Sequence, residues 1–128
     1  MKFLVTGGAG FIGSNLVDKL INDNHQVVCI DNESADSNLK FYWNTKARNY
    51  YIDINDFCSL RWVFQHEKPD MVFHLAAEAR IQPTVNEPQK ACMTNFVGTC
   101  NVLQASKENL VKRVIYSSTS SAYGLDNV

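Results

Sequence analysis

The sequence lacks three features that would point to a membrane or to a nucleic acid. No apolar run approaches the roughly 20 residues that a membrane helix needs. The apolar segment 1–13 is broken by four glycines and has no signal-peptide pattern. Twelve basic side chains face 13 acidic ones, so the net charge of −1 gives no basic excess for binding nucleic acid. We therefore expect a cytoplasmic protein with neither a membrane nor a nucleic acid as its partner.

The sequence also lacks a recognisable metal or disulfide pattern. Its four cysteines form no C-x-x-C pair, and its three histidines lie at no metal-ligand spacing from them. We expect no metal site. The apolar surroundings of Cys29, Cys58, Cys92 and Cys100 predict buried free thiols. No internal repeat, low-complexity tract or linker interrupts the 128 residues, so residues 1–128 are expected to form a single domain.

Short apolar runs alternate with helical stretches along the whole chain. The runs predict five strands, each buried on both faces, at Lys2–Thr6, Gln26–Asp31, Asn49–Ile52, Asp70–Leu75 and Lys112–Ser117. Strands that alternate with helices through short connections predict right-handed crossovers and a parallel sheet. The expected fold class is therefore α/β, an open doubly wound sheet with the first strand in its centre.

Three long helices are expected between these strands. The first starts near Ile12, the second is capped by Asn55, and the third is entered through Pro83 and Pro88 and runs to about Glu108. The buried faces of the first two helices are predicted to comprise Leu16, Val17, Leu20 and Ile21, and Phe57, Leu60, Val63 and Phe64. The polar segment 32–48 is expected to be a long loop, and loops of that length are usually functional or mobile.

A glycine-rich turn follows the first strand directly. The segment T-G-G-A-G-F-I-G at 6–13 matches G-x-G-x-x-G through Gly8, Gly10 and Gly13, and G-x-x-G-x-x-G from Gly7. A strand precedes it and an amphipathic helix follows, which is the context that a dinucleotide-binding turn requires. The early glycines let the backbone approach a pyrophosphate, and the last lets the helix pack on the strand. The helix start offers free N–H groups to the phosphates. The alternative is a merely structural tight turn.

An acidic residue, Asp31, ends the second predicted strand, 18 residues beyond Gly13. There its carboxylate can accept both hydroxyls of the adenosine ribose. The same negative charge would repel a 2′-phosphate, and no arginine follows before Arg48. These residues favour NAD over NADP.

With these residues in place, the chain resembles the extended short-chain dehydrogenase family, the NAD-dependent sugar-nucleotide epimerases and dehydratases, and above all its UDP-glucose 4-epimerase type. Four segments carry the resemblance: 6–13, Asp53-Ile54, H-L-A-A-E-A at 74–79 and S-S-T-S-S-A-Y-G at 117–124. It covers residues 1 to about 124 and implies a Rossmann-type doubly wound parallel sheet of about five strands, truncated relative to the family. The implied cofactor is NAD.

The resemblance also implies which residues contact NAD. The pyrophosphate would meet the turn and the start of the helix, at Gly7, Gly10, Phe11, Ile12 and Gly13. The adenosine would lie against residues that follow the second and third strands, namely Asp31, Asn32, Asp53 and Ile54. The groove beyond the fourth strand would be lined by Leu75, Ala76 and Ala77, although ordinary core packing is an alternative for the two alanines.

A polar amide is expected among small residues on the third helix. Asn95 shares a helical face with Ala91, Gly98 and Val102, and such an amide needs a partner. The resemblance places its partner on the cofactor or on the active-site backbone, while a purely structural role is an equal alternative. Thr94 occupies a position that contacts cofactor in the epimerases.

The resemblance implies a catalytic position at Thr119, whose hydroxyl would bind the sugar hydroxyl being oxidised. The family also uses a Tyr-x-x-x-Lys pair, roughly 25 residues further on, to take the hydroxyl proton while hydride moves to NAD. The sequence printed here stops at Val128, and Tyr123 has Asn127 four residues on. Tyr42-x-x-x-Lys46 spells the pattern, but it falls in the loop at the adenosine side and is interpreted as a decoy.

The expected function is the NAD-binding portion of a sugar-nucleotide epimerase that is inactive alone. Dehydratases of the family usually carry Asp-Glu where this chain has Ser120 and Ser121, which favours the epimerase. The alternatives are a non-catalytic NAD-binding module, or the N-terminal part of a dehydratase, decarboxylase or reductase. A nucleotide sugar would be a substrate only if further sequence or another chain completes the site. The apolar edge Arg113–Ser117 is expected to invite self-association.

Overall fold

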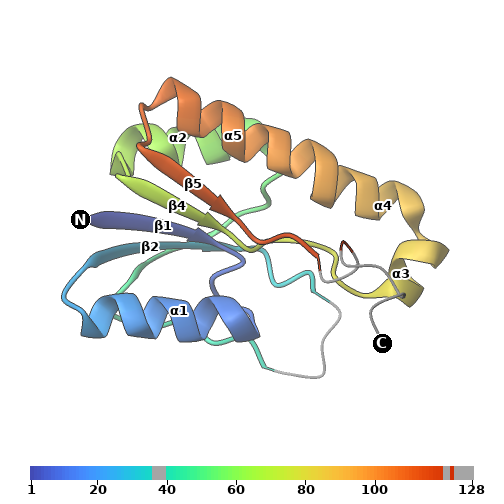
Figure 1. The fold of residues 1–128 in the computed structure, drawn as a ribbon, viewed down its shortest axis with the longest axis horizontal. Coiled ribbons are helices and arrows are strands. Elements are labelled where there is room, and N and C mark those ends of the chain that lie inside the picture. The colour runs from blue at the N-terminus through green and yellow to red at the C-terminus, as the bar shows by residue number, and fades with distance from the viewer. Residues whose placement is uncertain (36–39, 120–121, 123–128) are drawn as a thin grey trace.

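The computed structural model describes residues 1–35, 40–119 and 122. Its centre is a five-stranded parallel sheet in the order β3-β2-β1-β4-β5 (Figure 1). The strands are β1 (Lys2–Thr6), β2 (Gln26–Asp31), β3 (Arg48–Tyr51), β4 (Met71–His74) and β5 (Arg113–Tyr116). The predicted doubly wound fold, with its first strand central, is confirmed. The last three strands differ from the predicted bounds by one residue at each end. The expected burial on both faces is wrong for the edge strands β3 and β5, which are mostly exposed because each pairs with one neighbour only in the described part of the chain.

The direction in which the sheet grows reverses at β1. The chain passes from β1 to β2 and β3 on one side, then crosses to β4 and β5 on the other. Thr6, the last residue of β1, pairs with Ile30 of β2 and with His74 at the end of β4. In open α/β sheets, ligands bind outside the carboxyl ends of the strands at such a switch point.

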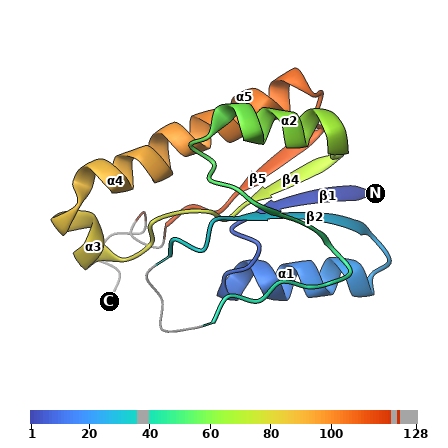
Figure 2. The same cartoon turned by 180° about the vertical axis from the view of Figure 1, so that it is seen from behind.

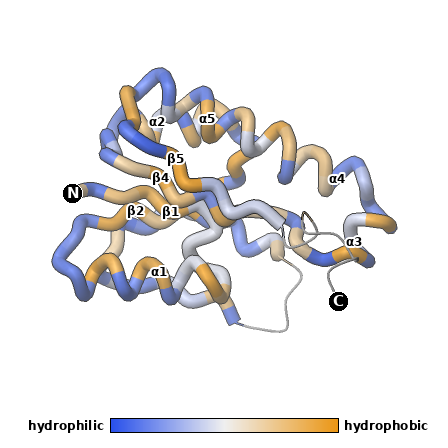
Figure 3. Tube along the Cα trace, in the orientation of Figure 1, coloured by the Kyte–Doolittle hydropathy of each residue, from blue (hydrophilic) through white to orange (hydrophobic). Residues whose placement is uncertain are grey.

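Helices cover both faces of the sheet. Helix α1 (Phe11–Asn22) lies on one face, and α2 (Phe57–Glu67) and α5 (Thr99–Glu108) lie side by side on the other (Figures 1 and 2). Because side chains alternate along a strand, Phe3 and Val5 pack toward α1 while Leu4 packs toward the opposite pair of helices. In Figure 3 hydrophobic colouring follows the strands, whereas hydrophilic and hydrophobic segments alternate along α1. Two apolar layers therefore hold the sheet between its helices.

The second helix begins one residue later than predicted. The expected cap, Asn55, is wrong, because Asp56 is the N-cap and its side chain accepts hydrogen bonds from Ser59 N (3.1 Å) and Ser59 Oγ (2.5 Å). Asn55 instead donates its N–H to Asp53 Oδ1 (2.8 Å) in the turn before the helix. Two neighbouring residues suited to capping compete here, and the turn at Asp53 decides between them.

The third predicted helix is divided into several parts. A short helix α3 (Ile81–Asn86) is followed by its C-cap Glu87, and α4 (Pro88–Cys92) then leads into the π-helical turn η1 (Met93–Gly98) and on into α5. The π-helical turn was not predicted. Such turns insert one residue into a helix and are frequent at functional sites.

The cysteine prediction is wrong for three of the four residues. Cys29 is buried, but Cys58, Cys92 and Cys100 are exposed. These three cysteines face outward from their helices, whereas apolar residues near them in the sequence face the core. Across residues 1–35, 40–119 and 122, the structure holds no helix both long and apolar enough to span a bilayer.

Candidate dinucleotide-binding site

A groove runs along the carboxyl edge of the sheet, where β1, β2, β3 and β4 end. The predicted residues that line it are Gly7, Gly10, Asp31, Asn32, Asp53, Ile54, Leu75, Ala76, Ala77 and Thr94. They come from five separate segments of the chain, which only the parallel register brings to one edge. The sheet therefore gathers most of the sequence-predicted contacts into one continuous surface.

The glycine turn fits tightly between β1 and the start of α1. A Cβ on Gly13 would lie 2.0 Å from the Gly7 carbonyl oxygen, and one on Gly7 would lie 2.8 Å from Ala76 N. Gly7 also has a φ of +68°, in the left-handed region that favours glycine. The nearest atom to a Cβ on Gly10 would be the Gly7 oxygen at 3.4 Å, so its outer side stays open to the groove.

The first turn of α1 provides backbone donors beside this opening. The first main-chain hydrogen bond of the helix runs from Ser14 N to Gly10 O (2.9 Å), so the amides of Phe11, Ile12 and Gly13 precede it. The N-cap residue, Gly10, has no side chain that could occupy them. The helix dipole adds partial positive charge at this end, which suits an anion such as a pyrophosphate.

Asp31 lies at the end of β2 and is almost fully buried. Its Oδ2 accepts the Ala9 N–H (3.0 Å) and its Oδ1 accepts the Glu33 N–H (2.8 Å). A carboxylate has about four acceptor positions, so each oxygen keeps one for a further donor. The same side chain therefore holds the glycine turn and can receive the two hydroxyls of a ribose.

The wall opposite the turn consists of Asp53 and Ile54. Asn101 of α5 donates its side-chain amide to Ile54 O (2.9 Å), which ties this wall to the helix behind it. A Cβ on Gly98 would lie 2.5 Å from Ile54 Cδ1, so glycine is what lets η1 approach so closely. Ile54 is buried, and this packing fixes where it borders the groove.

Asn95 binds main chain. Its Oδ1 accepts the Glu78 N–H (2.8 Å) and its Nδ2 donates to Glu78 O (3.0 Å), so both functional groups of the amide have a partner. It thereby holds the segment that follows Ala77 against η1. The neighbouring Thr94 lines the groove itself.

Besides the residues predicted to contact NAD, the groove is lined by Ile30, Ser34, Ala35, Phe41 and Ile52. Ile30 and Ile52 lie near strand ends, and the sequence placed them only within predicted strands. Phe41 belongs to the long loop, where no local pattern marked it. The loop is held at this place because Tyr42 donates its N–H to Ala9 O (2.9 Å) and Trp43 Nε1 donates to Glu33 Oε1 (2.6 Å).

Comparison with known proteins agrees with this geometry. The sequence pattern of the NAD dependent epimerase/dehydratase family matches residues 3–128. The chain belongs to the NAD-dependent epimerase/dehydratase family.

Relatives within this family include several UDP-glucose 4-epimerases. The crystal structure of the enzyme from Thermotoga maritima, solved with UDP-glucose, has a TM-score of 0.90 and 42% identity over 100% of this chain and 41% of that one. The Thermus thermophilus enzyme, solved with NAD, has a TM-score of 0.86 and 30% identity over 93% of this chain and 38% of its own. The Drosophila melanogaster enzyme is 36% identical over 94% of this chain and 38% of its length. The chain thus spans about two fifths of these relatives.

NAD is the cofactor of this family, and the groove has the features that it requires. Gly7, Gly10 and Gly13 form a cradle that a Cβ would fill, and the first amides of α1 and the Asp31 carboxylate supply donors and acceptors of the required kinds. When bound, NAD supplies a hydride acceptor. The described residues would hold its pyrophosphate at the turn and its adenosine between Asp31 and Ile54.

The predicted catalytic residue, Thr119, follows the end of β5 by three residues. Its carbonyl oxygen accepts the Ala122 N–H (3.2 Å), and its placement beyond β5 puts it at the carboxyl edge of the sheet. Ser120, Ser121, Tyr123 and Asn127 lie outside the described residues. The Tyr42 and Lys46 pair lies in the loop between β2 and β3, where Tyr42 is tied to the glycine turn through its main chain.

Behind the groove lies a buried imidazole. His74 at the end of β4 is 1% exposed, and burial lowers the pKa of its ring from 6.5 to about 4. Its Nδ1 lies 2.6 Å from Thr6 Oγ1 and its Nε2 lies 2.9 Å from Thr99 Oγ1. The ring of Tyr116 lies 5.7 Å away on β5. In the sequence, His74 was noted only as the first residue of the segment 74–79 that carries the family resemblance.

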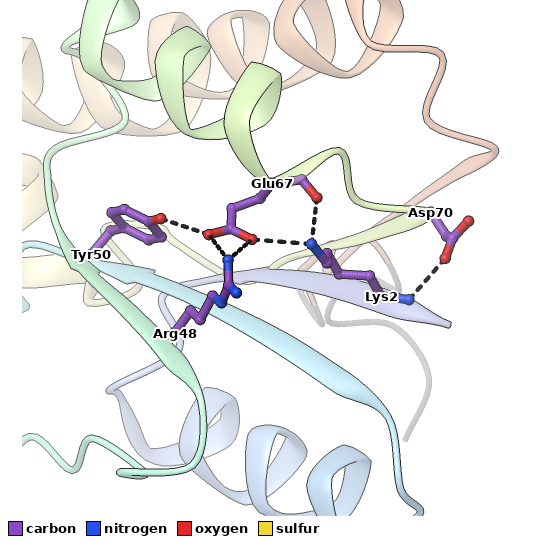
Figure 4. A network of polar contacts seen from close by, with 5 residues as sticks. All are labelled: Lys2, Arg48, Tyr50, Glu67 and Asp70. Carbon is purple, nitrogen blue, oxygen red and sulfur yellow. Dashed lines mark hydrogen bonds and ion pairs between the residues drawn. The ribbon is translucent and has the colours of Figure 1, made fainter.

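A second buried polar cluster lies at the opposite, amino edge of the sheet (Figure 4). The Glu67 carboxylate accepts hydrogen bonds from Tyr50 Oη (2.6 Å), from Arg48 (3.1 Å to each oxygen) and from Lys2 Nζ (3.2 Å). Burial alone would raise the pKa of Glu67, but these donors outweigh it, and the pKa lies below its ordinary value of 4.5. Burial and the carboxylate raise the pKa of Tyr50 to about 12. This cluster is remote from the groove and joins α2 to β1 and β3.

Proposed function

We propose that this chain forms the NAD-binding part of a nucleotide-sugar epimerase of the UDP-glucose 4-epimerase type. In this reaction a sugar hydroxyl is oxidised by hydride transfer to NAD, and the hydride then returns to the other face of the keto sugar. The observation that carries the proposal is the continuity of the groove from Asp31, past the glycine turn, to Ala77 and Thr94. Thr119 would bind the sugar hydroxyl from the end of the neighbouring strand, β5.

The names of the relatives support the choice of substrate class. The structures and sequences described above are UDP-glucose 4-epimerases from bacteria and an insect. The sequence difference from dehydratases at Ser120 and Ser121 supports the same choice, because serine cannot protonate a leaving hydroxyl as a carboxylic acid does.

A chimera tests this proposal directly. In the chimera, residues 1–128 replace the corresponding segment of the Thermotoga maritima enzyme, because the match to that enzyme covers 100% of this chain. We expect the chimera to interconvert UDP-glucose and UDP-galactose. A chimera that folds and binds NAD but does not turn over either sugar would contradict the proposal.

Two substitutions at one position sharpen the test of Thr119. In the chimera, Thr119→Val removes the hydroxyl while keeping the shape, and we expect kcat to fall about 10-fold, the scale of one lost hydrogen bond. Thr119→Ser restores a hydroxyl and serves as the matched control. Equal kcat values for the valine and serine variants would remove Thr119 from the proposed mechanism.

We further propose that residues 1–128 alone bind NAD but do not turn over a sugar nucleotide. The sequence after Thr119 offers no Tyr-x-x-x-Lys pair within these residues to move the proton. The assay follows UDP-glucose and UDP-galactose with NAD and the purified chain. Measured turnover of either sugar nucleotide by residues 1–128 would contradict this proposal.

The edge strand β5 is the basis of a proposal about self-association. Ile115 and Tyr116 are exposed on it, and an exposed edge invites pairing with another chain. Light scattering over a range of concentrations should show mass rising with concentration. A constant monomer mass at high concentration would count against pairing through β5.

A further inference from the structure

A chain of buried and half-buried hydrogen bonds connects the glycine turn to the π-helical turn through His74. Thr6 Oγ1 lies at one side of the ring, directly before the turn, and Thr99 Oγ1 lies at the other, at the start of α5. Thr6 and His74 are fully or almost fully buried. Because the glycine turn and Thr94 of the π-helical turn both line the groove, the ring connects two of the segments that form it.

The direction of each hydrogen bond follows from the donors available. Thr99 Oγ1 donates its single proton to Asn95 O (2.8 Å), so toward His74 it can only accept, and His74 Nε2 must carry a hydrogen. On the other side, Thr6 Oγ1 accepts the Ala76 N–H (3.3 Å) and shares the Leu75 N–H (3.2 Å) with the Thr6 carbonyl oxygen (3.1 Å). Its own proton then points to His74 Nδ1, which must be bare. The geometry therefore fixes one neutral tautomer.

We propose that His74 is a positioning residue of the NAD groove, which as a neutral imidazole protonated on Nε2 locks the glycine turn and the π-helical turn at one fixed spacing. On the groove side of β1, the bond orients the Thr6 hydroxyl that receives Leu75 and Ala76. On the helix side, it orients the Thr99 hydroxyl that holds the Asn95 carbonyl. This inference rests on the binding of NAD by this groove.

The π-helical turn is the part that needs such support. Its wider hydrogen-bond pattern changes which N–H donates to each carbonyl oxygen, and the Thr99 hydroxyl donates to the Asn95 oxygen from four residues on. The same turn presents Thr94 to the groove and uses the Asn95 side chain to hold Glu78. A displaced Thr99 would therefore loosen Thr94 and the Glu78 segment together, without any contact of its own with NAD.

The first experiment needs no substitution in the protein under test. A long-range ¹H–¹⁵N correlation spectrum of the full chain at neutral pH reports which ring nitrogens of each histidine carry hydrogen, and the spectrum of His74→Phe assigns the His74 signals by their loss. We expect a neutral ring protonated on Nε2 alone. A ring protonated on Nδ1, on both nitrogens or as a tautomer mixture would overturn the proposal.

The second experiment compares two threonines that make the same local bond. Thr99→Val removes the link to His74, whereas Thr84→Val removes an equivalent bond from Thr84 Oγ1 to Arg80 O (2.7 Å) in α3, away from the imidazole. By calorimetry, we expect Thr99→Val to weaken NAD binding about 10-fold, the scale of one lost hydrogen bond, and Thr84→Val to leave it unchanged. Thr99→Ser should restore the dissociation constant.

Equal NAD affinities for the two folded valine variants would overturn the proposal. Hydrogen exchange at the Glu78 amide, held by Asn95, supplies a readout that does not depend on NAD, and it should be faster in Thr99→Val than in the wild type. Unchanged exchange would likewise overturn it. A wild-type chain that does not bind NAD would refute the assignment of the groove, while the ring spectrum and the exchange rate would still decide whether His74 connects the two turns.

Discussion

A polar cluster lies at each edge of the sheet, and the one at the amino edge is charged whereas the one at the carboxyl edge is neutral. At the amino edge, Glu67 is ionised and is surrounded by Lys2, Arg48 and Tyr50 (Figure 4). At the carboxyl edge, a neutral His74 lies between the two hydroxyls of Thr6 and Thr99. Each cluster ties a strand of the sheet to a helix or to a neighbouring strand, yet only one of them uses charge.

The difference follows from what each edge must accommodate. The amino edge can balance the charge of Glu67 with two cations, of which Arg48 remains largely exposed to water. The carboxyl edge borders the groove, where Asp31 and the dipole of α1 set the field for a charged dinucleotide. The neutral His74, hydrogen-bonded to Thr6 and Thr99, holds these segments in place without adding a fixed charge beside the ligand.

The largest expected effect breaks the charged cluster. Glu67→Gln keeps the shape but places an amide NH₂ against donors that expect an acceptor, and breaking a buried ion pair costs about 3–5 kcal/mol. We expect the free energy of unfolding, measured by urea denaturation, to fall by this amount. NAD affinity of the folded variant should be unchanged, because the cluster is remote from the groove.

A matched substitution on the surface provides the control. Glu108 pairs with Arg61 at 2.8 Å, but both side chains are partly exposed. Glu108→Gln should therefore cost under about 1 kcal/mol. If the two variants lose the same stability, the buried cluster has no special weight.

Acidification is expected to weaken the neutral cluster before the charged one. The unfolded imidazole binds a proton near pH 6.5, whereas the folded His74 binds one only near pH 4, so the unfolded state holds more protons in between. Stability should fall by about 3 kcal/mol as the pH drops from 6.5 to 4. Because the pKa of Glu67 is lowered, its contribution to stability is present above about pH 4.5 and is lost only below that pH.

The variant His74→Phe separates these two windows. Denaturation curves at several pH values should show a smaller loss between pH 6.5 and 4 for His74→Phe than for the wild type. Both proteins should still lose stability at lower pH, where Glu67 protonates. Parallel curves for the two proteins across the upper window would contradict the neutral state of His74.

A smaller effect tests a single donor of the charged cluster. Tyr50→Phe removes the 2.6 Å hydrogen bond to Glu67 but leaves Lys2 and Arg48 in place. A hydrogen bond to a charged group contributes about 1.5–3 kcal/mol, and the partly exposed position of Tyr50 favours the lower end. Thermal unfolding of Tyr50→Phe, beside that of Glu67→Gln, should show the smaller loss. An equal loss would mean that the phenol dominates the cluster.

The sequence was sufficient for the features that depend on neighbouring residues. The turn at Gly7, Gly10 and Gly13 lies between a strand and a helix, so its shape follows from a local pattern. The position of Asp31 at a strand end and the burial of Leu60 and Val63 on α2 follow from strand length and helical period in the same way.

The remaining features depend on partners distant in the chain. The contact between Thr6 and His74 joins residues 68 positions apart, and it exists because β1 and β4 pair in one register. The π-helical turn is held by Thr99 and by the close approach of Gly98 to Ile54. No local pattern signals either contact, nor the place of Phe41 in the groove.

The most direct test of the account compares NAD with NADP in calorimetric titrations of the full chain. Asp31 at the ribose end should make NAD bind more tightly than NADP, and Asp31→Ala should weaken NAD binding by about 1–3 kcal/mol, the scale for an unpaired charged hydrogen bond. Binding of NAD in preference to NADP, with that preference lost in Asp31→Ala, is the predicted result. Failure to bind NAD, or equal binding of both cofactors by the wild type, would contradict the account.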